Sequence, residues 1–227
     1  MTFSRRSNNA APLTVFLLVI FCLAGASVPA GAQSLSADAL AKRIDKHYDS
    51  LHSLEVNFTQ QYEGMGMDRH ESGVLLLKKP GRMRWSYLRP AGKLFLLDGH
   101  YGYFYSPGDT TAQRIPAKEI NDLRSPLRLL LGHTKLEKEL TGLAIDPNAG
   151  GTYTLTGIPR GLENRVSSFS ITATSEGVIT QMQIDETDGV RNTFQFTDER
   201  PNAPAPTSDF VFTPPSGVRI VDGMPPV

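Results

Sequence analysis

The sequence has little cysteine, no excess of either charge and no apolar run of membrane-spanning length. One of its 227 residues is cysteine, which excludes an intramolecular disulfide framework or a cysteine-rich zinc site. Basic and acidic residues number 23 each, so the chain lacks the basic footprint of a nucleic-acid-binding domain. With 40% hydrophobic residues it also lacks the composition of a disordered chain. We therefore expect a folded protein with no nucleic-acid partner.

The first 32 residues have the order of a secretory signal peptide. Arg5 and Arg6 precede an apolar run at residues 13–24, and small residues follow up to Ala32. This run is shorter than the roughly 20 residues that a helix needs to cross a bilayer, which argues against an anchor. We predict cleavage after Ala32, leaving residues 33–227 as one slightly acidic domain. Because Cys22 is removed, the mature chain suits an oxidising compartment.

The mature chain begins with a predicted amphipathic helix at residues 36–50. Leu40, Ile44 and Tyr48 form one apolar stripe, and Ser36 is placed to cap the first turn. The period then changes to two, as in a half-buried strand, over residues 54–62. Glycine and proline separate further expected strands at 70–79, 82–88, 93–98, 101–106, 110–115, 152–157, 166–174, 178–185, 190–197 and 209–213. A second helical segment is expected at residues 118–132. The pattern predicts a mainly β fold with some α structure, built on one antiparallel sheet of about ten or eleven strands.

Motifs of catalysis and of cofactor binding are absent from the sequence. There is no G-x-S-x-G of a serine hydrolase, no glycine-rich phosphate loop and no H-E-x-x-H zinc motif. The five histidines have no compact ligand spacing. We therefore predict no enzyme, no cofactor and no metal site; a secreted hydrolase with a dispersed site is the weakest alternative.

Aromatic side chains gather on two of the expected strands. Met83 and Trp85 share one strand face with Tyr87, and Tyr103 shares another with its neighbouring tyrosines. Two interpretations are open: a plain core of a curved sheet, or the wall of a ligand cavity enclosed by a curled sheet and a helix. A methionine beside aromatics would suit a flexible apolar ligand, because its thioether adapts its shape.

At these residues the sequence resembles the LolA family, periplasmic carriers of outer-membrane lipoproteins. The stretches that carry the resemblance span nearly the whole mature chain and lie at residues 58–60, 73–85, 98–99, 103–105, 125–127 and 210–218. The K-P-G-x-x-R-W segment, which ends at Trp85, is the strongest of them. The resemblance implies an incomplete, curled antiparallel β-barrel with a helical lid.

The resemblance also implies a site and partners. Met83, Trp85 and Phe95 would line the cavity, and Leu127 and Leu130 would lie on the lid; we also assign Phe58 and Tyr103 to the wall and Leu40, Ile44 and Tyr48 to the lid. The family usually has an arginine before the proline at position 80, where it holds the lid closed. Here that position is Lys79, which lacks the planar fork of arginine, so we expect a weaker latch. The implied partners are acylated lipoproteins, an inner-membrane transporter and an outer-membrane receptor, with the carrier as a monomer.

Other functions remain open at the level of the sequence. The same fold could carry another lipid, such as a glycolipid. A β-domain that carries nothing could instead bind a protein along an exposed edge of its sheet.

Overall fold

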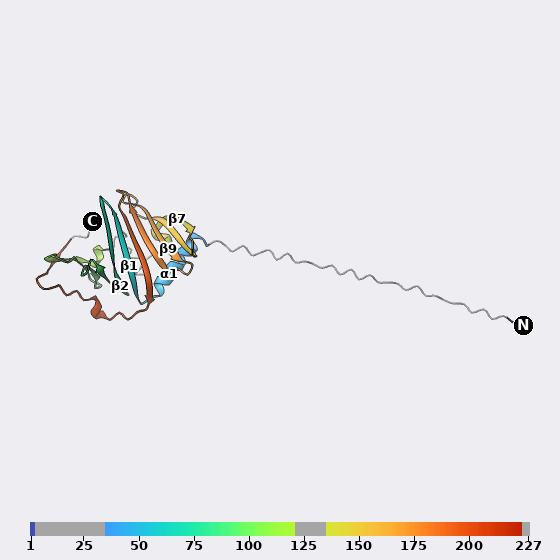
Figure 1. Cartoon of the computed structure of the whole chain (residues 1–227), viewed down its shortest axis with the longest axis horizontal. Coiled ribbons are helices and arrows are strands. Elements are labelled where there is room, and N and C mark those ends of the chain that lie inside the picture. The colour runs from blue at the N-terminus through green and yellow to red at the C-terminus, as the bar shows by residue number, and fades with distance from the viewer. Residues whose placement is uncertain (3–34, 121–134, 224–227) are drawn as a thin grey trace. The chain divides into compact units, whose positions relative to one another are not determined.

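The computed structural model describes residues 1–2, 35–120 and 135–223 (Figure 1). The chain divides into two units, Met1–Ser34 and Leu35–Val227, and the fold described below is that of the second. The predicted signal peptide, and the predicted lid residues Leu127 and Leu130, lie outside the described residues.

Helix α1 (Ala37–Ser50) forms where the apolar stripe predicts it. Ser36 caps the helix, because its hydroxyl accepts the backbone N–H of Ala39 at 3.2 Å. The stripe residues Leu40, Ile44 and Tyr48 are buried, so the helix presents its apolar side to the sheet. None of the described helices is long and apolar enough to cross a membrane.

The described strands form one sheet (Figure 1). They are β1 (Ser53–Gly64), β2 (Met67–Lys78), β3 (Arg82–Arg89), β4 (Leu94–Leu97), β5 (Tyr101–Tyr105), β6 (Thr111–Pro116), β7 (Leu140–Pro147), β8 (Thr152–Pro159), β9 (Val166–Thr174), β10 (Ile179–Glu186), β11 (Arg191–Pro201) and β12 (Arg219–Asp222). The order is β12-β6-β5-β4-β3-β2-β1-β11-β10-β9-β8-β7. Short helical turns complete the described chain: η1 (Ala117–Glu119), α3 (Leu136–Glu139) and η2 (Thr207–Phe210).

The mainly β fold with few helices is confirmed, and the sheet is open. It holds twelve strands in the described residues, where the sequence predicts ten or eleven, and β12 and β7 form its two edges. All neighbours pair antiparallel except β12, which runs parallel to β6. In the middle of the sheet, β1 pairs with β11, which lies far along the chain, and Phe58 faces Phe196 in this pairing.

Two strands escape the sequence pattern and one predicted strand is wrong. Strand β7 carries Gly142 and a register shift at an exposed edge, which weakens the alternation, and β12 has only four residues. The predicted strand at 209–213 is instead the end of η2 followed by irregular chain. Its apolar alternation has another cause, since Phe210 is buried and Phe212 stacks on Tyr103.

Candidate functional site

The face of the sheet that α1 covers carries a group of large apolar side chains. Trp85 of β3 contacts the rings of Phe58 of β1 and Phe194 of β11, with centroids 4.6 Å apart for Phe58–Trp85 and 5.6 Å for Trp85–Phe194. Phe95 of β4 pairs directly with Trp85 and contacts Phe104 at 4.6 Å. These residues and Met83 belong to one buried cluster with Leu40, Ile44 and Tyr48 of α1. We call Phe58, Met83, Trp85, Phe95 and Phe194 the apolar cluster.

Trp85 is the centre of the apolar cluster. Its side chain is 3% exposed, and its indole N–H donates to the sulfur of Met83 at 3.0 Å. A buried indole needs a partner for its N–H, and the thioether supplies a weak acceptor without bringing a charged group to this face. Met83 itself is fully buried. This contact explains why a methionine stands two residues before the tryptophan.

Gly73 allows the rings to meet. It lies on β2 between Phe58 and Tyr87, facing both in the sheet register. A Cβ atom at this position would lie 2.2 Å from the carbonyl oxygen of Ser86 and 2.9 Å from the ring of Phe58. Without a side chain at residue 73, Phe58 and Tyr87 pack edge to face with centroids 5.1 Å apart.

Tyr103 does not belong to the apolar cluster, so its assignment to the same wall is corrected. Its cross-strand partners are Leu96 and Arg114, whereas Trp85 pairs with Phe95. Successive residues of a strand point to opposite faces, which places Tyr103 on the other side of the sheet. There its ring stacks on Phe212 at 4.9 Å, and burial together with Asp98 raises its pKa.

Helix α1 is fixed to the sheet by a buried hydrogen-bond network. The Tyr48 hydroxyl donates to the Glu199 carboxylate at 2.9 Å and accepts the backbone N–H of Ile179 at 3.1 Å. His47 contacts the other oxygen of Glu199 at 2.7 Å. Burial and the neighbouring carboxylate raise the pKa of Tyr48, so its hydroxyl stays protonated and available as a donor.

Lys79, the residue at the predicted latch position, contacts the end of α1. Its ammonium group donates to the backbone carbonyl of Tyr48, in the last turn of the helix. The backbone N–H of Leu51 also donates to this carbonyl, at 3.3 Å, and carbonyls in the last turn of a helix favour a nearby cation. Partial burial lowers the pKa of Lys79, while Asp49 opposes this shift.

Asp45 ties α1 to the chain that follows residue 134. Its carboxylate accepts the backbone N–H of Leu136 at 3.2 Å, and its side chain lies at the buried edge of the helix. Lys135 also pairs with Asp49 at 2.6 Å. Burial is the main cause of a raised pKa of about 6 for Asp45. The carboxyl-terminal half of α1 is therefore held by Glu199, by Lys79 and by the chain at residues 135–136.

Sequence reasoning missed a polar group beside the apolar cluster. Gln60 accepts from the Tyr87 hydroxyl at 3.2 Å and donates to Asn192 at 3.1 Å. Lys93 pairs with Glu71 at 2.5 Å and lies over the ring of Tyr87. We call Gln60, Glu71, Tyr87, Lys93 and Asn192 the polar cluster. The parity of Gln60 with Phe58 in β1 was the one sequence signal that these groups share the covered face.

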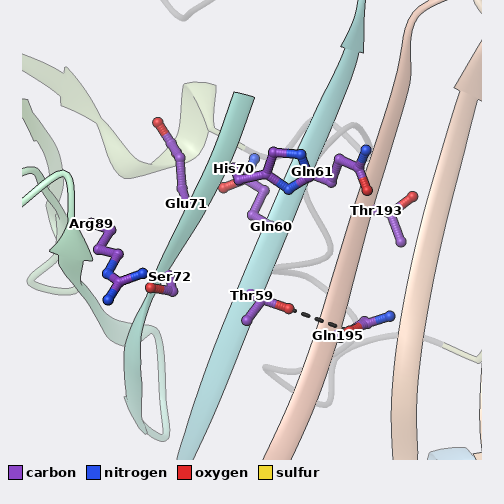
Figure 2. A pocket seen from close by; sticks show the side chains of 9 residues that line it. All are labelled: Thr59, Gln60, Gln61, His70, Glu71, Ser72, Arg89, Thr193 and Gln195. Carbon is purple, nitrogen blue, oxygen red and sulfur yellow. Dashed lines mark hydrogen bonds between the residues drawn. The ribbon is translucent and has the colours of Figure 1, made fainter. Parts of the chain in front are cut away.

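A hollow of about 400 Å³ lies beside β1, β2 and β11 and has a polar lining (Figure 2). Its lining residues are Thr59, Gln60, Gln61, His70, Glu71, Ser72, Arg89, Thr193 and Gln195. None of the predicted cavity residues is among them. The side chains of Thr59 and Gln195, 3.5 Å apart, join two of its strands.

An open sheet with one apolar face closed by an amphipathic helix defines the structural class of this chain. Residues 49–213 match the sequence pattern of a family described as outer membrane lipoprotein carrier protein LolA, and the chain belongs to that family. The family is one of carriers rather than enzymes.

Individual relatives cover most of the chain. It is 26% identical over 212 residues to the outer-membrane lipoprotein carrier protein of Chromobacterium violaceum, covering 93% of this chain and 98% of the relative. The carrier protein of Proteus mirabilis is 29% identical over 195 residues, covering 85% and 92% of the two chains. Among solved structures, a LolA superfamily protein from Nitrosomonas europaea aligns with a TM-score of 0.43 and 11% identity, over 79% of this chain and 99% of that one.

Proposed function

We propose that this protein carries lipoproteins through the periplasm by binding their acyl chains against the apolar cluster. The observation that supports this best is the continuous set of buried aromatic side chains on the face that α1 covers, in a chain of the LolA family. Carriers of this family are periplasmic, and the signal-like residues 1–32 favour export of this chain with cleavage after Ala32.

The proposal includes a route. An inner-membrane transporter would release the acylated lipoprotein to the carrier, and an outer-membrane receptor would accept it. Leu40, Ile44 and Tyr48 support a helical cover over the bound chains because they belong to the same buried core as the apolar cluster. Lys79 supports a latch, since its ammonium group holds the end of α1 through one carbonyl.

The single tryptophan of the chain makes acyl-chain contact measurable. Trp85 is the only tryptophan in the sequence, so its fluorescence reports the apolar cluster alone. A synthetic lipopeptide with brominated acyl chains should quench this fluorescence on binding, and the same peptide without acyl chains should not. Wild-type protein that binds the lipopeptide without quenching would contradict the assignment of the site.

Variants of neighbouring residues on one strand test the same assignment in cells. Trp85→Glu should abolish retention of lipoprotein by the protein purified from envelope extracts, because a buried carboxylate opposes apolar ligands. Leu88→Glu is the matched control, since Leu88 lies on the same strand but is 65% exposed. Trp85→Phe should keep binding. Circular dichroism establishes that each variant is folded, and normal retention by folded Trp85→Glu would refute the proposal.

The two alternatives predict different contents for the purified protein. Mass spectrometry of the native protein should find lipoprotein. Free lipid or glycolipid would favour a carrier of another lipid on the same fold. An empty protein would favour a β-domain that binds proteins through a sheet edge such as β7.

A further inference from the structure

The covered face of the sheet changes from apolar to polar along β1. Leu54, Val56 and Phe58 point toward this face and are buried, and Gln60 follows at the next position of the same parity. Two residues along a strand span about 7 Å, so the amide group of Gln60 lies within one side-chain length of the rings. The change occurs away from the start of β1, which follows the end of α1 in the chain.

The polar cluster continues this boundary across four strands and the residue that precedes a fifth. Asn192 lies on β11, Gln60 on β1, Glu71 on β2, Tyr87 on β3 and Lys93 immediately before β4. Tyr87 touches both groups, because its ring packs on Phe58 while its hydroxyl donates to Gln60. The apolar cluster and the polar cluster therefore form one continuous surface.

The ion pair in this cluster is poorly explained by stability alone. The side chains of Glu71 and Lys93 are 12% and 27% exposed, so both charges are substantially desolvated. Desolvation offsets most of the attraction in such pairs, and apolar residues often replace them without loss of stability. The pair keeps donors and acceptors at the border of an otherwise apolar surface. Lys93 has three donors, and the tyrosine hydroxyl can accept as well as donate.

We propose that the polar cluster binds the polar head of the acylated ligand, meaning the ester or amide groups that join acyl chains to the peptide. Lys93 and Asn192 would donate to the carbonyl oxygens of these groups, and Glu71 would accept a peptide N–H. The acyl chains would then run from this boundary over Trp85 toward α1. This inference rests on the proposed function and adds to it an orientation of the cargo and a means of distinguishing lipopeptides from plain hydrocarbon.

Affinity for two probes tests the proposal. The first is a synthetic lipopeptide with ester-linked and amide-linked sixteen-carbon chains, and the second is hexadecane, which has no polar head. Lys93→Met keeps most of the side-chain length and removes the charge, and Tyr87→Phe removes only the hydroxyl. Each should weaken lipopeptide binding about tenfold and leave hexadecane binding within twofold of wild type. Tyr101→Phe, on the opposite face, is the matched control and should change neither.

The position of the head is tested by quenching of Trp85. Lipopeptides brominated near the ester group should quench wild-type fluorescence more than lipopeptides brominated at the chain end, because Phe58 contacts both Trp85 and Tyr87 of the polar cluster. Lys93→Met should reduce this difference. Thermal unfolding of each variant shows whether the fold is intact.

The outcomes separate this inference from the proposed function. Folded variants that bind the lipopeptide like wild type would overturn the role of the polar cluster and leave the carrier function standing. An equal loss of affinity for both probes would also overturn it, since the polar cluster would then act only by maintaining the shape of the apolar face. Wild-type protein that binds hexadecane but not the lipopeptide would refute the proposed function itself.

Discussion

Tyr48→Phe is the sharpest perturbation of the fold that supports the site. The substitution removes one oxygen atom and keeps the ring, which is 2% exposed. It eliminates the bond to the Glu199 carboxylate at 2.9 Å and leaves the backbone N–H of Ile179 without its 3.1 Å acceptor. A bond to a charged group and a buried unpaired donor each cost about 1–3 kcal/mol. We expect a net loss of about 3 kcal/mol, because water relaxes part of the damage.

Urea unfolding followed by the fluorescence of Trp85 measures this loss. For a domain of this size, 3 kcal/mol corresponds to a fall in Tm of about 6–12 °C. Tyr101→Phe is the control, because Tyr101 is 37% exposed and should change stability by less than about 0.5 kcal/mol. A Tyr48→Phe variant within 0.5 kcal/mol of wild type would refute the conclusion that this network fixes α1 to the sheet.

Three further predictions concern the same surface. Gly73→Ala should lower the free energy of unfolding by at least about 2 kcal/mol, because its Cβ would lie 2.2 Å from a backbone oxygen, while Ser72→Ala should not. Lys79→Met should cost about 1 kcal/mol and Lys79→Arg much less, since arginine keeps a donor for the Tyr48 carbonyl; equal losses in urea titrations would contradict this contact. Asp45 has a folded pKa of about 6 against 3.8 unfolded, so its contribution to stability is full below pH 3.8 and is lost as pH rises to about 6. Asp45→Asn should therefore make the unfolding free energy less steeply dependent on pH between these values, and an unchanged slope would show that the raised pKa is absent.

Local patterns predicted the parts of the fold that depend on local contacts. The stripe of Leu40, Ile44 and Tyr48 located α1, and the alternation around Phe58 located β1. Strand β12 pairs with β6 across about a hundred residues of sequence, and no local period reports such a pairing. Edge strand β7 packs only Leu143 and Ile145 partly against the core after its register shift, which leaves too short an alternation to recognise in the sequence.

Parity within a strand groups the candidate site residues only in part. Parity groups Met83 with Trp85 and groups Tyr103 with its neighbours, but it does not say which face two different strands share. The register supplies this information: Trp85 pairs with Phe95, and Leu96 pairs with Tyr103. Polar residues within the buried set, such as Gln60 and Glu71, look like ordinary solvated positions until that register is known.

The packing of the apolar cluster bears on how a carrier of this kind releases its cargo. Each buried methylene stabilises binding by about 0.8 kcal/mol, so one sixteen-carbon chain could gain on the order of 10 kcal/mol. Several chains bound at that strength would not dissociate, and the sequence contains no phosphate loop to couple release to a nucleotide. In the described residues Trp85 already contacts both Phe58 and Met83, and all three belong to the buried cluster that includes the apolar side of α1. An acyl chain that enters this cluster must replace contacts that exist without it, so the net affinity is the difference between two apolar packings. Binding that exchanges one packing for another is weak enough to reverse at a receptor and still shields the chains from water during transfer.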